Sequence, residues 1–272
     1  GMSDENLAEI RNEKAKKIQH PKGKLTAYER LNLLLDEGSF SEIDQHVASD
    51  ENPEGEAVIT GTGTIHGRPV FVFSEDFSVM GGSLGEVVAK KILKIMDHAL
   101  EARAPIIGIK DSGGARIQEG ISSLFGYAQI FKKNVEASGK VPQISVVVGP
   151  SAGGAVYSPA LTDFIFQVKD IGQLYVTGPA VVKTVTGEDV TFEELGGVEA
   201  HGTKSGVTHQ VCETEEQAFE EIRYLMSFLP QSSSQKPPMF ITEDEPSRVI
   251  ESLDGFIPEN RNQPYDMEKI IL

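Results

Sequence analysis

The sequence predicts an α/β protein whose central strands pair in parallel. Three times along the chain, a short apolar segment of strand length leads into two consecutive glycines and then into a segment with helical periodicity. Strands that alternate with helices in this way favour parallel pairing through right-handed crossovers. The 272 residues are enough for one large domain or two modest ones, and either would bury a sizeable core.

The N-terminal part of the chain precedes this series. Residues 2–21 are charged and predict a helical lead-in whose apolar content is thin. Thr26 and Glu29 have the spacing of a capping box, which predicts a second helix that stops at Gly38. Residues 57–74 carry β-branched side chains at every second position before a His-Gly turn, so they predict a β-hairpin.

The strand–glycine–helix units fill the middle of the chain, and a further helix follows them. A capping box from Ser83 to Glu86 predicts the start of the first helix of the series, and a second box at Thr214 and Gln217 predicts the start of the last. The predicted strands are 106–110, 144–148, 164–168 and 174–176, and the predicted helices are 83–102, 119–138, 214–230 and a short helix interrupted at Pro159. Residues 231–247 lack periodicity and have the composition of a linker.

The composition excludes several classes of function. A net charge of −16 argues against binding to nucleic acid or anionic lipid, since such binding depends on clustered Lys and Arg. No apolar run approaches the roughly 20 residues that cross a bilayer. The single cysteine, Cys212, excludes a disulfide framework and a multi-cysteine zinc site, and it fits a reducing, cytoplasmic setting. We expect no metal site, and any phosphate that binds must be held by local contacts.

Each glycine pair lies where a strand is predicted to end and a helix to begin. Glycine lets the backbone bend sharply there and exposes N–H groups near a helix N-terminus, where partial positive charge collects. One pair alone is most simply a tight turn. Three pairs at the same ends of parallel strands converge on one edge of the sheet, which is where open α/β sheets bind ligands. The pairs are Gly81–Gly82, Gly113–Gly114 and Gly153–Gly154.

A second interpretation competes for the same region. Residues 149–153 fit the pattern G-x-S-x-G directly after an apolar strand, which is the position of the nucleophile in a serine hydrolase. Ser151 is then the nucleophile. Candidates for the acid and the base follow in hydrolase order, namely Asp163 or Asp189 and His201 or His209. Because the pattern is short and chance matches are common in a glycine-rich chain, this is the weaker alternative.

Five longer blocks, in a fixed order, carry a more specific signal than any glycine pair. They are KGKLTAYERLNLLLDEGSF (22–40), DFSVMGGSLGEVVAKKI (76–92), SGGARIQEG (112–120), GPSAGGAVYSPALTDF (149–164) and TGPAVVKTVTGEDVTFEELGG (177–197). Together they resemble the carboxyltransferase subunits of propionyl-CoA carboxylase and methylmalonyl-CoA decarboxylase. The resemblance covers nearly the whole chain.

The resemblance implies a crotonase-like (ClpP/crotonase) fold, a spiral of repeated β-β-α units in which backbone N–H groups form an oxyanion hole for a thioester. By matching position, it implies that three glycine-rich segments surround the substrate. The catalytic residues that it implies are Gly153 and Gly154, whose N–H groups stabilise the enolate oxygen, with Gly113 and Gly114 on the other side of the thioester. Ala115 lines the thioester beside Gly113 and Gly114 and also belongs to the coenzyme A-binding residues, which further include Arg116, Gly81 and Gly82. Arg116 also fits a plain ion pair at the surface.

The resemblance further implies the acyl-CoA-binding half of a biotin-dependent carboxyltransferase. Such an enzyme moves a carboxyl group between biotin and the α-carbon of acetyl-, propionyl- or methylmalonyl-CoA. Residues 22–230 match the first of the family's two domains, and residues 231–272 lead towards an absent second, carboxybiotin-binding domain. The implied partners are that domain, a biotin carboxyl carrier protein and further copies of the chain. A non-catalytic CoA-binding or assembly domain is a third interpretation, and the sequence decides neither the preferred acyl-CoA nor the direction of transfer.

Overall fold

The computed structural model describes residues 4–152, 155, 159, 161–175 and 209–236. All of them belong to one compact unit, residues 1–238. Three predicted features fall largely or wholly outside the described residues: the pair Gly153–Gly154, the short helix at Pro159 and the linker beyond residue 236.

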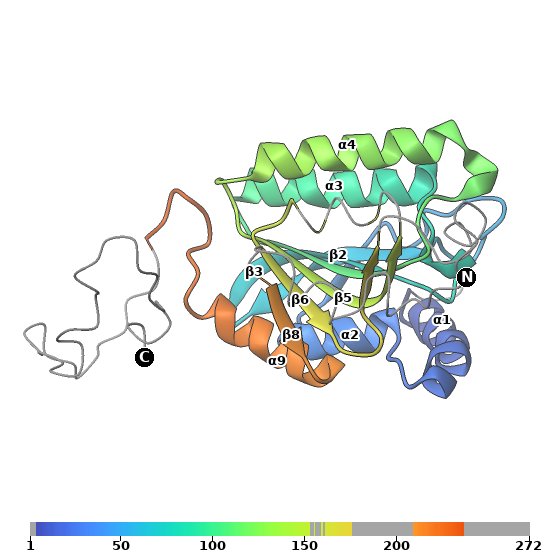
Figure 1. Ribbon diagram of the computed structural model, residues 1–272, viewed down its shortest axis with the longest axis horizontal. Helices are drawn as coiled ribbons and strands as arrows, with labels where there is room; N and C mark the ends of the chain where they lie inside the picture. Colours follow the sequence, from blue (N-terminus) through green and yellow to red (C-terminus); the bar gives the residue numbers. More distant parts are fainter. Residues whose placement is uncertain (1–3, 153–154, 156–158, 160, 176–208, 237–272) are drawn as a thin grey trace, which may run out of the picture. The chain divides into compact units, whose positions relative to one another are not determined.

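An eight-stranded mixed sheet forms the centre of this unit (Figure 1). The first three strands, β1 (Ser41–Ile43), β2 (Val58–Ile65) and β3 (Arg68–Glu75), pair antiparallel. The others join in parallel and are β4 (Ile106–Ser112), β5 (Gln143–Ala152), β6 (Phe164–Val168), β7 (Gln173–Tyr175) and β8 (His209–Cys212). The strand order is β1-β2-β3-β4-β5-β6-β8, with β7 beside the end of β5. The predicted hairpin and the parallel pairing are confirmed.

Helices cover both faces of the sheet (Figure 1). α3 (Glu86–Ala102) and α4 (Ile121–Ala137) lie side by side on one face, and α2 (Ala27–Leu34) and α9 (Glu215–Met226) lie together on the other. The remaining helical segments are α1 (Asp4–Gln19), which is the lead-in, and the short 3-10 segments η1 (His20–Lys22), η2 (Met80–Gly82) and η3 (Ile117–Glu119). None of the helices described is both long and apolar enough to span a membrane.

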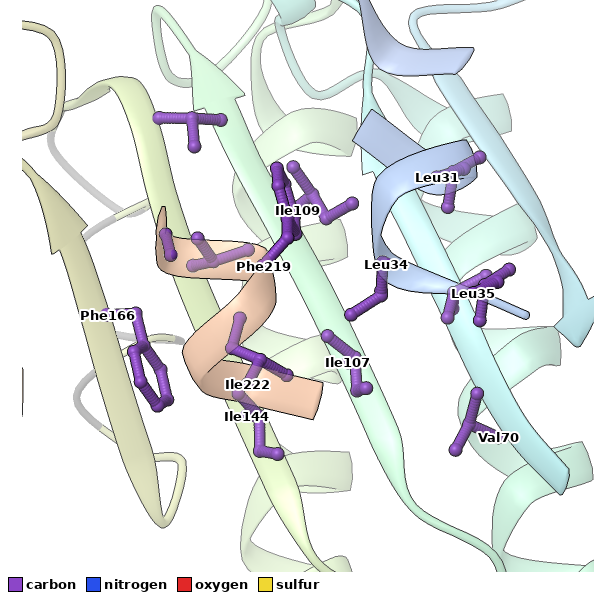
Figure 2. Packing of buried hydrophobic residues seen from close by; sticks show 14 of the residues in the cluster. Leu31, Leu34, Leu35, Val70, Ile107, Ile109, Ile144, Phe166, Phe219 and Ile222 are labelled. Carbon is purple, nitrogen blue, oxygen red and sulfur yellow. The ribbon is translucent and has the colours of Figure 1, made fainter. Parts of the chain in front are cut away.

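The central strand β4 shows how the core is divided between the two faces. All of its residues are buried. Ile107 and Ile109 pack into the cluster under α2 and α9, where Leu34 and Ile222 meet them (Figure 2). Ile106 belongs to the cluster under α3 and α4. Successive side chains of a strand point to opposite faces, so a strand that is covered on both faces is largely apolar. The apolar run that begins at Ile106 therefore located β4, although the strand continues to Ser112 rather than stopping at Lys110.

Local capping signals located two helix starts correctly. The Thr26 hydroxyl accepts the N–H of Glu29 at 3.1 Å, and the Glu29 carboxylate accepts the N–H of Thr26 at 2.9 Å, which completes the predicted capping box. The Thr214 hydroxyl accepts the N–H of Gln217 at 3.1 Å. Both helices therefore begin where a side chain satisfies an otherwise unpaired N–H group.

The predicted capping box from Ser83 to Glu86 is wrong. α3 begins after Gly85, and the Ser83 hydroxyl donates to the carbonyl of Met80 at 2.8 Å instead. Other boundaries also shift: α2 ends at Leu34 rather than Gly38, α9 ends at Met226 rather than Pro230, and β5 continues to Ala152 rather than stopping at Val148.

The carboxylate of Asp36 joins three elements that are distant in the sequence. It accepts the N–H groups of His66 at 3.1 Å and Gly67 at 2.9 Å, the Thr64 hydroxyl at 2.7 Å and the Arg223 guanidinium at 2.8 Å. Partial burial acts to raise the pKa of Asp36, but these hydrogen bonds outweigh it and hold that pKa well below its ordinary value. The end of α2, the hairpin turn and α9 are thereby fixed to one another.

We predict that Asp36→Asn lowers the free energy of unfolding at pH 7 by about 1 kcal/mol, allowing for solvent screening at a partly exposed site. Because the folded-state pKa is depressed, this stabilisation is complete above the ordinary pKa of aspartate, roughly 4, and is lost as the pH falls through the folded-state pKa. Urea denaturation across this pH range measures the difference in free energy of unfolding between the wild type and Asp36→Asn. Asp50→Asn, at an exposed position, serves as the control, and a gap that does not shrink on acidification would contradict the assignment.

Candidate active site

Two of the three glycine pairs come together at the carboxyl ends of β3 and β4. The N–H of Gly113 donates to the carbonyl of Gly81 at 2.9 Å, and the N–H of Leu84 donates to the carbonyl of Gly114, also at 2.9 Å. The N–H of Arg116 donates back to the Leu84 carbonyl at 2.8 Å, so that a short parallel bridge links Leu84 and Ala115. We call residues 81–84 and 113–116 the paired glycine loops. They form one continuous rim at the edge predicted from the sequence.

Glycine is required at Gly82 for two reasons. Its φ of +65° lies in the left-handed region, and a Cβ atom there would collide with the backbone carbonyl of Asp111. Gly114, with a φ of +105°, is also in a conformation that other residues rarely adopt. The glycines therefore let the two loops approach closely enough for backbone pairing.

The direction of the N–H groups changes the assignment made from the sequence. The N–H of Gly113 points to the Gly81 carbonyl, and the N–H of Gly114 points to the Ser112 hydroxyl at 3.1 Å, so each already has a protein acceptor. Among the residues described, the N–H of Ala115 has no acceptor. Within this loop the donor left for a ligand is therefore Ala115, while Gly113 and Gly114 shape the backbone that presents it. Gly153 and Gly154 lie outside the described residues; the last part of β5 before them pairs Ser151 with Ser112.

Arg116 is an ion-pair partner, but a buried one. The residue is only 2% exposed, and its guanidinium donates to Glu56 at 2.9 Å, to Glu119 at 2.9 Å and to the Ser83 carbonyl at 3.3 Å. Burial acts to lower the pKa of Arg116, but the two carboxylates outweigh burial and raise it. The predicted ion pair of Arg116 is therefore present, but it is buried rather than at the surface. The guanidinium ties both paired glycine loops to Glu56, just before β2, which supports a role in shaping the rim.

Glu119 also closes the N-terminus of α3. Its carboxylate accepts the N–H of Glu86 at 2.5 Å while holding Arg116 with its other oxygen. A carboxylate at a helix N-terminus satisfies free N–H groups and interacts favourably with the helix dipole. This contact from a distant residue takes the place of the local capping box, and it occupies the end of α3 that the sequence suggested as an oxyanion site.

A cluster of buried charges lies directly behind the rim. Asp111 accepts Lys24 at 2.8 Å, Arg30 at 2.7 Å and Gln19 at 3.2 Å, and Arg30 also donates to Glu215 at 2.6 Å. Burial is the main influence on Lys24 and lowers its pKa in spite of the neighbouring Asp111. Sequence reasoning missed this cluster. The available signal was Arg30, which stands on the apolar face of α2, where a charge is stable only if it is paired.

Ser151 occupies a different setting from a hydrolase nucleophile. It lies within β5, is 0% exposed, and its hydroxyl oxygen has no hydrogen-bond partner among the residues described. A nucleophile elbow instead presents its serine on a sharp turn at the top of the sheet. Two of the candidate partners, Asp189 and His201, lie outside the described residues. In the described part of the chain, no group of three His, Cys, Asp or Glu side chains could hold a metal ion.

With this geometry established, comparison with known proteins decides the family. The family model described as the carboxyl transferase domain matches residues 18–272. The chain belongs to the carboxyl transferase family. It is 55% identical over 261 residues to the propionyl-CoA carboxylase beta chain of Roseobacter denitrificans, covering 93% of this chain and 51% of that protein. It is 52% identical to methylmalonyl-CoA decarboxylase subunit alpha of Veillonella parvula, covering 98% of this chain and 55% of that protein.

Solved structures of carboxyl transferases agree with the fold. Transcarboxylase 12S, solved as a hexamer with methylmalonyl-coenzyme A bound, superposes with a TM-score of 0.86 at 44% identity, covering 98% of this chain and 55% of that one. The beta subunit of geranyl-CoA carboxylase from P. aeruginosa gives a TM-score of 0.74 at 28% identity, covering 97% and 50%. The predicted crotonase-like fold is confirmed. The chain spans about half the length of the curated carboxyl transferases that it matches.

We predict that Gly82→Ala destabilises the protein by about 2–3 kcal/mol more than Gly38→Ala, as measured by urea denaturation. Both glycines have a positive φ, +65° and +69°, so the two variants share the same backbone strain. Only Gly82 faces a carbonyl at the site of the new methyl group, whereas nothing lies within 4 Å at Gly38. Equal losses would show that the paired glycine loops do not depend on this close approach.

Proposed function

We propose that this chain is the acyl-CoA-binding half of a biotin-dependent carboxyltransferase acting on a short acyl-CoA such as propionyl- or methylmalonyl-CoA. The observation that carries the proposal is the pair of glycine loops, whose bonding pattern leaves the Ala115 N–H as a donor at the edge of the sheet. Membership of the carboxyl transferase family and the similarity to propionyl-CoA and methylmalonyl-CoA enzymes support the substrate class.

The chemistry requires an oxyanion hole more than it requires a base. Removing the proton next to a thioester places negative charge on the carbonyl oxygen, and an N–H donor aimed at that oxygen is worth roughly 2.7–4 kcal/mol. The Ala115 N–H supplies one donor in this proposal, and Gly153 and Gly154 supply the donors on the other side. The backbone thereby favours the enolate over the neutral thioester.

The described side chains behind the rim fit a reaction in which the cofactor handles the proton. Asp111 and Glu56 are buried and ion-paired, so neither is placed to act as a dedicated base. Biotin, when bound, would supply the carboxyl group and take up the α-proton in carboxylation, and in the reverse direction it would accept the carboxyl group and return that proton to the α-carbon. This chain's part is to bind the acyl-CoA, hold its carbonyl and keep the α-carbon in place. A second carboxyltransferase domain, a biotin carrier and further copies of the chain are the partners that we propose.

We predict that propionyl-CoA raises the unfolding temperature of the purified chain. At a ligand concentration of 100 times Kd, the stabilisation is about 2.7 kcal/mol, or roughly 5–10 °C for a chain of this size. Gly153→Pro and Gly154→Pro remove the N–H groups assigned to the oxyanion, so the ligand should protect each variant less than the wild type. The unfolding temperature without ligand checks that each variant folds. No shift with any acyl-CoA or with CoA itself would count against the proposal.

We predict that the chain alone transfers no measurable carboxyl group to free biotin and that adding the second carboxyltransferase domain of a relative restores transfer. Turnover can be followed with radiolabelled carboxyl groups. Efficient transfer by the chain alone would contradict the prediction. CoA binding without turnover in the reconstituted system would instead identify a non-catalytic CoA-binding domain, and covalent labelling of Ser151 by a fluorophosphonate probe would identify a hydrolase.

A further inference from the structure

Most cations near the rim are already neutralised. Among the described residues, Lys24 and Arg30 pair with Asp111 at 2.8 and 2.7 Å, and three further cations near this edge are also paired. The latter pairs are Lys110 with Glu75 at 2.9 Å, Arg11 with Asp76 at 3.3 Å and Arg116 with Glu56 at 2.9 Å. A cation that is already paired with a buried carboxylate attracts an external anion only weakly. In a protein with a net charge of −16, binding of a phosphate therefore needs a separate, local cation.

Lys22 is such a cation. It is exposed at the end of η1, and in the part of the chain that the structure describes no carboxylate lies within ion-pair distance of its ammonium. Its Nζ atom lies 4.9 Å from the centre of the Phe77 ring, in a cation–π contact. The same ring lies 3.9 Å from the position that a Cβ atom on Gly81 would occupy. Phe77 therefore places the Lys22 charge beside the paired glycine loops.

The backbone that carries Lys22 is fixed at both ends. The N–H of Gly23 donates to the His20 carbonyl at 2.9 Å, and Gly23 adopts a φ of +71° to close the turn. The N–H of Lys24 donates to the Gln19 carbonyl at 3.1 Å, while the Lys24 side chain is anchored on Asp111. A charge held on a fixed turn and against an aromatic ring loses less conformational freedom on binding than a free surface lysine.

We propose that the Lys22 ammonium binds a phosphate group of the coenzyme A part of the substrate. This inference rests on the proposed function, because it assumes that an acyl-CoA lies along the paired glycine loops. With the thioester carbonyl near the Ala115 N–H, the flexible pantetheine arm runs out from the rim, and its phosphates need a cation outside the buried pairs. Lys22 provides that cation as a compact point charge, which suits a phosphate oxygen.

The test is the affinity of the full 272-residue chain for CoA, measured by titration calorimetry at low salt, where surface charges are least screened. We expect Lys22→Ala to weaken CoA binding roughly tenfold, the loss of one charge-assisted hydrogen bond. Lys22→Arg, which keeps the charge, should retain most of the affinity. Lys17→Ala is the matched control, since it removes the same charge from an exposed position on α1, and it should change the affinity by less than about twofold.

Two further ligands, compared with CoA, separate the possible causes. Pantetheine lacks phosphates, so its binding should be the same in wild type and Lys22→Ala; a loss there would mean that the substitution distorts the loops, and would overturn the inference. Dephospho-CoA lacks only the 3′-phosphate. If Lys22→Ala still weakens the binding of dephospho-CoA, Lys22 contacts the diphosphate. If Lys22→Ala leaves the binding of dephospho-CoA unchanged, Lys22 contacts the 3′-phosphate. Either result supports phosphate binding.

The two proposals fail in distinguishable ways. Wild-type protein that binds neither CoA nor propionyl-CoA would overturn the proposed function together with this inference. Wild-type protein that binds CoA, with Lys22→Ala indistinguishable from Lys17→Ala, would overturn the role of Lys22 alone.

Discussion

The structure of the candidate site depends on the placement of one buried residue, Asp111, at the end of the central strand. Its carboxylate is 0% exposed and is held by Lys24, Arg30 and Gln19 from the N-terminal region. A buried charge is tolerated only when such partners compensate for its lost hydration. Its backbone carbonyl and its carboxylate fill the spaces where side chains at Gly82 and Gly149 would otherwise lie. One residue thus dictates glycine at two positions that are far apart in the chain.

The parallel pairing of β3 with β4 explains why the 81–84 and 113–116 loops lie at one rim, because the segments that follow two parallel strands emerge at the same edge of the sheet. Backbone pairing between the 81–84 and 113–116 loops then uses the N–H groups of Gly113 and Leu84. Among the described residues of these loops, the N–H of Ala115 is left without an acceptor. Gly113 and Gly114 use their N–H groups within the protein, and the unpaired N–H belongs to the next residue, Ala115.

Sequence reasoning located the elements whose signals are local and missed the interactions that are not. The apolar run at 106–110, the hairpin before it and the cap at Thr26 each depend on neighbours within a few residues, and each was found. The cap of α3 comes from Glu119, 33 residues after Glu86, and no spacing rule predicts it. The direction of each N–H group depends likewise on which distant loop lies opposite. The family resemblance pointed to the 81–84 and 113–116 segments, whereas the acceptors of the Gly113 and Gly114 N–H groups follow only from the three-dimensional arrangement of the loops.

The N-terminal helix is fastened to this rim by charge rather than by apolar contact alone. The Arg11 guanidinium donates to the Glu56 carbonyl at 2.8 Å and to the Asp76 carboxylate at 3.3 Å, and Asp76 is only 4% exposed. Shortened versions of the protein that begin where the family match begins, at residue 18, would delete Arg11 and strand a carboxylate under the loop that leads to Gly81. Shortened versions made for crystallisation or fusion should therefore keep α1, because Arg11 on this helix neutralises the buried carboxylate of Asp76.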